Sequence, residues 1–252
     1  MKKIIVSLFV TFVILLMSVS SFAQGKLPVL MYHNVTTDYD LVIKDPTVHI
    51  TVSALEEHLV SLISAGYNTI SLDDYSALLS ENKPLPKNPV LITFDDGYVS
   101  NYDLAYPLFQ KYNLKATIFV IASRMGADNV EFPHFSWEEA REMEKSGLID
   151  IESHSFTHPN FSSLSYAETV VEMRLSKFAI ESNLGKKCRY FAYPYGKLNP
   201  SSSAVAKSAG YEMVLVGRDK SADIPIVNAY EIPRYTIKGT HSGEDVINLF
   251  KE

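Results

Sequence analysis

Short apolar runs alternate with amphipathic segments along most of this chain, and no other feature of the sequence restricts its fold as much. Such alternation is typical of a parallel sheet whose strands are joined by crossover helices. Eight of the runs have the length and composition of strands. They are residues 29–32, 69–71, 90–94, 116–121, 148–153, 190–193, 212–216 and 231–237.

Capping boxes mark the starts of three of the intervening helices. In this motif a Ser or Thr side chain and a Glu three residues later satisfy each other's exposed amides. Gly66 and Gly147 offer left-handed caps at the ends of the first two helices. The three boxes are Ser53 with Glu56, Ser136 with Glu139, and Ser165 with Glu168.

The pattern predicts one α/β domain, and its eight strands favour a barrel related to the (β/α)₈ type. An open doubly wound sheet would show the same alternation, so that architecture stays open. Barrels of this kind often contain roughly 200–250 residues, which matches the 229 residues that follow residue 23. No internal repeat, low-complexity tract or long linker divides the sequence.

The first 23 residues have the pattern of a signal peptide, with a positive start at 1–3 and an apolar run over 4–17. Ser21 and Ala23 offer small residues for cleavage, which would leave 24–252 as the mature domain. Cleavage predicts a protein that is secreted or held in the cell envelope, with no stable membrane partner. An uncleaved anchor is the alternative, because about 20 apolar residues can span a bilayer.

Charge and cysteine content exclude several classes of function. Without residues 1–23 the chain has 21 basic and 29 acidic residues, a net charge of -8, which gives no reason to expect a nucleic-acid partner. Cys188 is the only cysteine, so internal disulfides and a thiolate metal cluster are both excluded. We expect Cys188 to be a small buried side chain beside a strand.

Two acidic residues, Asp95 and Asp96, directly follow an apolar strand within the motif Thr-Phe-Asp-Asp-Gly-Tyr. In a barrel, the carboxyl ends of the strands form the active-site face. One carboxylate could bind a metal while its neighbour, which points elsewhere, accepts a proton. A turn with a helix cap is the alternative, since Asp-Asp-Gly is ordinary turn chemistry.

Two histidines, His154 and His158, follow another strand in the same way. Spaced four apart in one loop, they could converge on a single ion if the loop turns once. Imidazole nitrogens with a carboxylate and open positions suit zinc or a similar transition metal at a catalytic centre. Together with Asp95 and Asp96, they favour a metal site over purely structural hydrogen bonding.

A third motif, Tyr-Pro-Tyr-Gly at 193–196, also closes a strand, and by itself it is an adequate aromatic turn. In this order the three motifs resemble those of the polysaccharide deacetylase family, also called carbohydrate esterase family 4 or the NodB homology domain. Residues 28–33 and 136–147 are also typical of it. The resemblance covers nearly all of the chain after residue 23. It implies a distorted (β/α) barrel of about seven to eight parallel strands.

The resemblance also implies a role for each matching residue. Asp96, His154 and His158 would bind a divalent metal ion, with Zn²⁺ as the first choice and Co²⁺, Ni²⁺ or Mn²⁺ as alternatives. Asp95 would be the general base that activates water. The backbone amide of Tyr195 would stabilise the oxyanion of the tetrahedral intermediate.

Two family positions are filled differently in this chain. The late Leu-x-His motif that supplies the general acid is missing, and residues 30–33 resemble a branch in which that strand has moved to the N-terminus. His33 is therefore the expected acid, with a buried structural histidine as the alternative. Ala192 stands where many members have an Arg that tethers the base. We expect Arg234 to replace it, unless Arg234 only forms a surface ion pair.

These assignments predict a metal-dependent hydrolase that removes N-acetyl groups from an N-acetylglucosamine polysaccharide, such as peptidoglycan, a chitin-like chain or an exopolysaccharide. An O-acetyl esterase acting on xylan would use the same site. A glycan-binding protein without turnover and a structural cell-wall protein are further alternatives. Tyr98, Phe135, Tyr193 and Tyr195 could stack on sugar rings, although aromatic residues in strands more often belong to the core.

Overall fold

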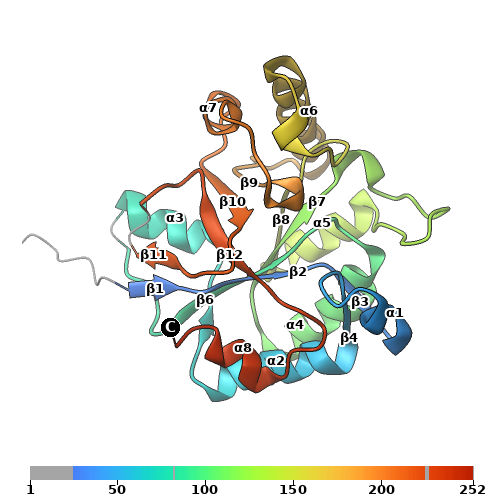
Figure 1. Cartoon of the computed structure of the whole chain (residues 1–252), viewed down its shortest axis with the longest axis vertical. Coiled ribbons are helices and arrows are strands. Elements are labelled where there is room, and N and C mark those ends of the chain that lie inside the picture. Colours follow the sequence, from blue (N-terminus) through green and yellow to red (C-terminus); the bar gives the residue numbers. More distant parts are fainter. Residues whose placement is uncertain (1–24, 82, 225–226, 252) are drawn as a thin grey trace, which may run out of the picture.

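Seven parallel strands of the described chain close into a barrel, because β2 pairs with β12 on one side and with β6 on the other. The computed structural model that shows this describes residues 25–81, 83–224 and 227–251 (Figure 1). In order around the barrel the strands are β2 (Val29–Tyr32), β12 (Ile232–Thr236), β10 (Met213–Gly217), β9 (Tyr190–Ala192), β8 (Ile149–Ser153), β7 (Ala116–Val120) and β6 (Pro89–Phe94).

The closing pair of β2 with β6 confirms the barrel and rules out the open doubly wound sheet. The expected strand at 69–71 forms only the short β5 (Asn68–Thr69), which pairs with the first residues of β6 outside the ring. Four further short strands were not predicted. They are β1 (Gly25–Leu27), which pairs with β11 (Ala222–Ile224), and β3 (Asn34–Thr36), which pairs with β4 (His49–Thr51).

Helices cover the outside of the barrel, as the amphipathic segments predict. Figure 1 shows α2 and α8 side by side, and the two helices pack on each other. The described α-helices are α1 (Tyr39–Lys44), α2 (Val52–Ser64), α3 (Leu72–Glu81), α4 (Tyr106–Tyr112), α5 (Trp137–Lys145), α6 (Tyr166–Leu184), α7 (Ser202–Ser208) and α8 (Gly243–Asn248).

The helix starts agree with the sequence at two of the three expected capping boxes. Helices α5 and α6 begin with the predicted boxes of Ser136 and Ser165. The box at Ser53 is wrong, because the N-cap of α2 is Thr51, whose side chain accepts a hydrogen bond from the Ala54 amide. Thr51 is also the last residue of β4, so strand and helix adjoin and Ser53 lies inside the first turn.

Side chains alternate between the two faces of each barrel strand. On β6, Ile92 and Phe94 belong to the core that packs under the helices, whereas Leu91 belongs to a second core. Phe119 of β7 and Leu215 of β10 share that second core, which fills the inside of the barrel. A barrel filled in this way is not a pore, and polar groups can gather only near its ends.

Two expectations concern residues away from the barrel strands. Cys188 is free and fully buried, as expected, and burial raises the pKa of its thiol. The predicted signal peptide at 1–23 lies outside the described residues. Within 25–81, 83–224 and 227–251, we find no helix with the length and apolar character needed to cross a bilayer.

Candidate active site

Four expected site residues belong to the inward-facing rows of four barrel strands. Inward positions recur at every second residue, so the row that contains Leu91 continues to Asp95, one step beyond β6. The same spacing places His33 just beyond β2, His154 just beyond β8, and Arg234 on β12. Since all these strands are parallel, the four side chains meet at the carboxyl end of the barrel.

The Asp-Asp-Gly turn brings the second carboxylate to the same centre. Asp96 has a φ of +72° and Gly97 a φ of +80°, both in the left-handed region. A Cβ atom at Gly97 would lie 2.9 Å from Cγ1 of Val120, so the turn requires glycine there for space as well as for conformation. This turn reverses the usual alternation, and the Asp95 and Asp96 carboxylates both approach His154.

Asp96, His154 and His158 offer three ligand atoms within 4.8 Å of one another. Oδ1 of Asp96 lies 3.6 Å from Nε2 of His154 and 3.2 Å from Nε2 of His158. Two ligands about 2.0–2.1 Å from a tetrahedral Zn²⁺ lie roughly 3.4 Å apart, so these spacings fit one ion. Oδ1 of Asp96 is also buried without a hydrogen-bond partner in the described chain, as a ligand atom would be.

The surroundings of the triad keep it in the form that binds a metal. Nδ1 of His154 lies 2.8 Å from the carbonyl oxygen of Ala192, which can only accept a hydrogen bond, so Nε2 keeps its lone pair. Burial lowers the pKa of His154 to about 4, and the ring is neutral at neutral pH. Burial alone would raise the pKa of Asp96, but the close contact with His158 and the neighbouring imidazoles hold it well below its usual range.

Asp95 is held by a buried guanidinium. Nη1 and Nη2 of Arg234 donate to Oδ1 and Oδ2 of Asp95, both at 2.7 Å, and Nη1 also lies 3.2 Å from Oγ1 of Thr93. The alternative of a surface ion pair is wrong, because Arg234 is 0% exposed. Burial would raise the pKa of Asp95, but the Arg234 charge and hydrogen bonds outweigh it and keep the carboxylate ionised.

His33 lies beside the two aspartates. The Asp95 amide donates to the carbonyl of Tyr32 at 2.9 Å, which ties the end of β2 to the Asp-Asp turn. The charge of His33 is among the causes that lower the pKa of both Asp95 and Asp96. Its Nδ1 is buried and has no hydrogen-bond partner among the described residues. A purely structural histidine would normally have one.

The four aromatic residues that were candidates for stacking on sugar rings differ clearly in their exposure. Phe135 and Tyr193 are 0% exposed and belong to the core. Tyr98 is half-buried and its ring lies 5.2 Å from that of His134. Tyr195 is 64% exposed, and its ring meets the His158 ring edge-on at 4.8 Å. Its φ of +61° turns the chain at this point, so Tyr195 is the candidate that can face a ligand beside the triad.

Two residues near the site were missed from the sequence. His134 is 5% exposed, and neither ring nitrogen has a partner in the described structure. Burial lowers its pKa to about 4; the charge of Asp96 raises this pKa, whereas that of His158 lowers it. Glu172 of α6 hydrogen-bonds to the loop that joins the two histidine ligands. Neither residue belongs to a motif that could have identified it.

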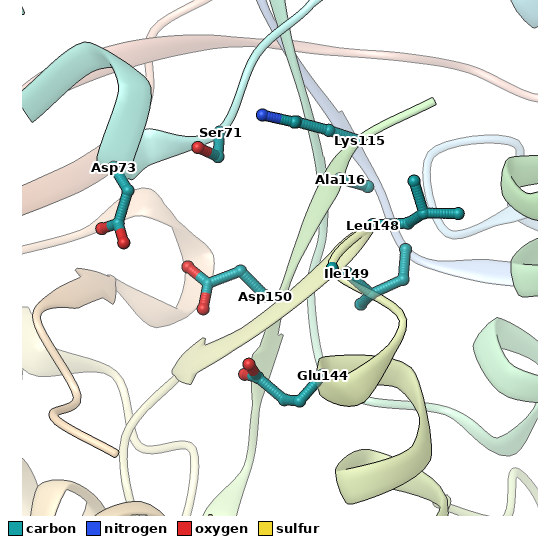
Figure 2. Close-up of a pocket in the computed structure, with 9 residues that line it drawn as sticks. Ser71, Asp73, Lys115, Ala116, Glu144, Leu148, Ile149 and Asp150 are labelled. Atoms are coloured by element: carbon teal, nitrogen blue, oxygen red, sulfur yellow. The ribbon is translucent and has the colours of Figure 1, made fainter. Parts of the chain in front are cut away.

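A pocket of about 180 Å³ lies away from these residues, at the opposite end of the barrel. Figure 2 shows residues that line it. It surrounds the starts of β7 and β8, with Ala116, Ile149 and Asp150 among its lining residues. None of the expected site residues lines it. In barrels the chemistry belongs to the carboxyl ends of the strands, so this pocket is not the candidate active site.

Comparison with known sequences gives one family. The sequence model described as polysaccharide deacetylase matches residues 82–214. YxkH of Bacillus subtilis (strain 168), which carries that family name, is 34% identical over 189 residues, or 75% of this chain and 63% of YxkH. A poly-β-1,6-N-acetyl-D-glucosamine N-deacetylase of Staphylococcus aureus (strain MRSA252) is 30% identical over 197 residues, or 75% of this chain and 67% of that protein.

Solved structures agree on the fold. The deacetylase PplD of Streptococcus pyogenes, solved with acetate, has a TM-score of 0.82 at 24% identity and covers 90% of this chain and 99% of its own. IcaB from Ammonifex degensii has a TM-score of 0.77 at 25% identity over 90% of this chain and 97% of its own. The chain is thus similar to these over nearly the whole barrel. It spans less than two thirds of the length of YxkH.

Proposed function

Because this chain belongs to the polysaccharide deacetylase family, we propose that it hydrolyses N-acetyl groups of an N-acetylglucosamine polysaccharide in a metal-dependent reaction. One observation carries the proposal. Asp96, His154 and His158 converge on one point, while Asp95 lies beside them, held by Arg234. A structural or purely glycan-binding protein has no need of this arrangement.

Asp96, His154 and His158 would hold the ion. One carboxylate oxygen and two imidazole nitrogens leave coordination positions open, as catalytic zinc sites do. A divalent ion bound there would polarise an acetyl carbonyl and lower the pKa of water from about 15.7 to about 7. We propose Zn²⁺, with Co²⁺, Ni²⁺ and Mn²⁺ as ions that accept the same donors.

Asp95 would accept the proton of the attacking water. Both of its oxygens are fixed by Arg234, so the carboxylate cannot rotate away from the triad. Each carboxylate oxygen has a second lone pair that remains free to accept a proton. A base positioned in this way contributes typically about 10²–10⁴ in rate.

His33 would give a proton to the leaving nitrogen, because an amide anion leaves poorly at neutral pH. Its position beside Asp95 and its unpartnered Nδ1 support this role. The backbone amide of Tyr195 would donate to the developing oxyanion. Removal of one such donor typically costs about 2.7–4 kcal/mol of barrier.

Poly-β-1,6-N-acetylglucosamine is the substrate that we propose to test first, since a relative 30% identical to this chain is named for that polymer. The exposed ring of Tyr195 would stack on a sugar ring beside the reacting acetyl group. Such polymers lie outside the cytoplasm. We therefore keep export through residues 1–23 as part of the proposal, and mass spectrometry of the mature N-terminus tests it, with Gln24 as the expected first residue.

Acetate release from β-1,6-linked N-acetylglucosamine oligomers and from acetylxylan tests the proposed activity. We expect release from the oligomers, loss of release after chelation, and recovery with Zn²⁺. Asp95→Asn should lower kcat by at least about 10²-fold, because the base is lost. Asp223→Asn makes the same change in an exposed ion pair and should leave kcat unchanged.

Two outcomes would contradict the proposal. Release from acetylxylan alone would favour an O-acetyl esterase. No release from either substrate by folded, zinc-loaded protein would favour glycan binding without turnover.

A further inference from the structure

The loop that joins the two histidine ligands has a strained backbone. Ser155 has a φ of +72° and His158 a φ of +66°, and neither residue is a glycine. Left-handed conformations of such residues persist only where the surrounding structure holds them in place. The position of His158 therefore depends on whatever fixes this loop.

Hydrogen bonds hold the loop from two sides. On one side, the amides of Ala122 and Ser123 donate to the carbonyls of Ser155 at 3.1 Å and Phe156 at 2.9 Å. On the other side, Oε2 of Glu172 accepts the amides of Phe156 at 2.9 Å and Thr157 at 2.8 Å. Oε1 of Glu172 accepts the Thr157 hydroxyl at 2.6 Å.

We propose that Glu172 is a positioning residue, which holds the loop in its metal-binding conformation before the ion arrives. The inference rests on the proposed metal site and adds a residue that no motif of the sequence marks. A carboxylate accepts several hydrogen bonds and donates none, so one side chain can satisfy two adjacent amides and a hydroxyl. Such charge-assisted bonds are stronger than neutral ones.

The helix that carries Glu172 is suited to this task. Helix α6 buries Met173, Ser176 and Ile180 against the rest of the protein, which fixes the backbone next to Glu172. The contact spans 15 or 16 residues of sequence and joins the helix to the residue that directly precedes His158. Glu172 thus acts on the ion through the loop, and it does not touch the ion itself.

Zinc affinity separates this role from a general contribution to folding. Zn²⁺ is titrated into metal-free protein against a chromophoric chelator, well below the unfolding temperature. Glu172→Gln replaces one acceptor oxygen by a donor group, and we expect the Kd for Zn²⁺ to rise about 10–100-fold. Thr157→Val removes only the hydroxyl contact, and its Kd should rise less, by about threefold.

Glu181→Gln is the matched control. Glu181 lies on the same helix, and its carboxylate also accepts a backbone amide, that of Cys188 at 3.1 Å, but far from the loop. Its zinc Kd should equal that of the wild type. If Glu172→Gln does not fold, as judged by circular dichroism, Thr157→Val decides the question.

Each outcome has one meaning. A wild-type protein that binds no Zn²⁺ would contradict the proposed function. A wild type that binds Zn²⁺, with Glu172→Gln or the deciding Thr157→Val at the same Kd, would overturn the role of Glu172 and leave the function standing. Equal losses in Glu172→Gln and Glu181→Gln would also overturn it, because the effect would then belong to the helix as a whole.

Discussion

Both ends of the barrel bury charged groups, but these groups differ in whether they have hydrogen-bond or ion-pair partners. At the carboxyl end, His33 and Asp96 each have a buried polar atom without a partner among the described residues. At the amino end, Nζ of Lys186 lies 2.6 Å from Glu144 and 3.3 Å from Glu152, and it also pairs with Asp150. Buried site atoms without a partner at one end and paired charges at the other indicate chemistry and stability, respectively.

Glu152, near the end of β8, illustrates this pairing because it joins β8 to the start of β9. Its Oε2 accepts the amides of Arg189 at 2.9 Å and Tyr190 at 2.8 Å, besides the contact of its other oxygen with Lys186. Arg189 in turn binds Glu212 and Asp73. The charged residues that line the pocket in Figure 2 all belong to ion pairs: Asp73, Lys115, Glu144 and Asp150. A cavity by itself is therefore a poor guide to the active site of this protein.

The largest effect is expected from a change at the carboxyl end. His154→Ala removes a metal ligand, and we expect kcat/KM to fall by about 10³-fold or more, together with the loss of tight zinc binding. Acetate release and zinc titration measure both effects. His241→Ala changes a histidine near the C-terminus that is not part of the triad, and this variant should retain activity. A His154→Ala protein that still binds Zn²⁺ and releases acetate would show that the carboxyl end of the barrel is not the catalytic end.

A change at the amino end should act on stability alone. Lys186→Met leaves Glu144 and Asp150 without their shared cation, and we expect the free energy of unfolding to fall by about 3 kcal/mol at pH 7. The kcat of the folded enzyme should not change, since the described ion pairs of Lys186 are with Glu144, Asp150 and Glu152 and not with the triad. Urea denaturation and acetate release distinguish these effects. A fall in kcat at unchanged stability would show that the two ends are not independent.

A smaller and sharper test uses pH, because the two ends should respond in opposite directions. Burial lowers the pKa of His154 to about 4, so between pH 6.5 and 4 the unfolded chain binds a proton that the folded, metal-free protein does not. Its contribution to stability is present above pH 6.5 and is lost on acidification, by roughly 2–3 kcal/mol. Urea denaturation of metal-free protein at several pH values measures this loss, and His154→Leu should reduce it.

For Glu152, which pairs with Lys186, the sign is reversed. Burial, with the charge of Asp150, raises the pKa of Glu152 to about 8. The protonated form therefore stabilises the fold, and this contribution is present below about pH 4.5 and is lost as pH rises through 8. Glu152→Gln should remove this fall in stability between about pH 4.5 and 8, whereas the loss on acidification that belongs to His154 should remain. Profiles that do not differ between the two variants would contradict the assignment.

The sequence indicated most of the site because strand ends and a period of two are local properties. Once the strands before Asp95 and His154 are recognised, the parallel barrel brings these residues to one face. His33 and Arg234 needed more than local pattern, since the family resemblance indicated which of the many strand-end residues to choose. The structure brings both beside Asp95.

The remaining features depend on packing that no local pattern contains. The contact of Glu172 with the histidine loop depends on where α6 packs against it. The burial of His134 depends on the chain near Tyr98, some 36 residues earlier in the sequence. The cap of α2 shifted from Ser53 to Thr51 because β4 ends there, and β4 exists only through its pairing with β3. Each of these features depends on tertiary contacts between segments that are distant in the sequence, so local sequence preferences do not predict it.

Anomalous diffraction from crystals of the zinc-loaded protein is the most direct test of the central claim. We expect one ion, about 2.0–2.2 Å from Asp96, His154 and His158, with Asp95 still bound to Arg234 and not coordinated. An ion at any other place, or one that takes Asp95 as a ligand and so removes the proposed base, would contradict the account.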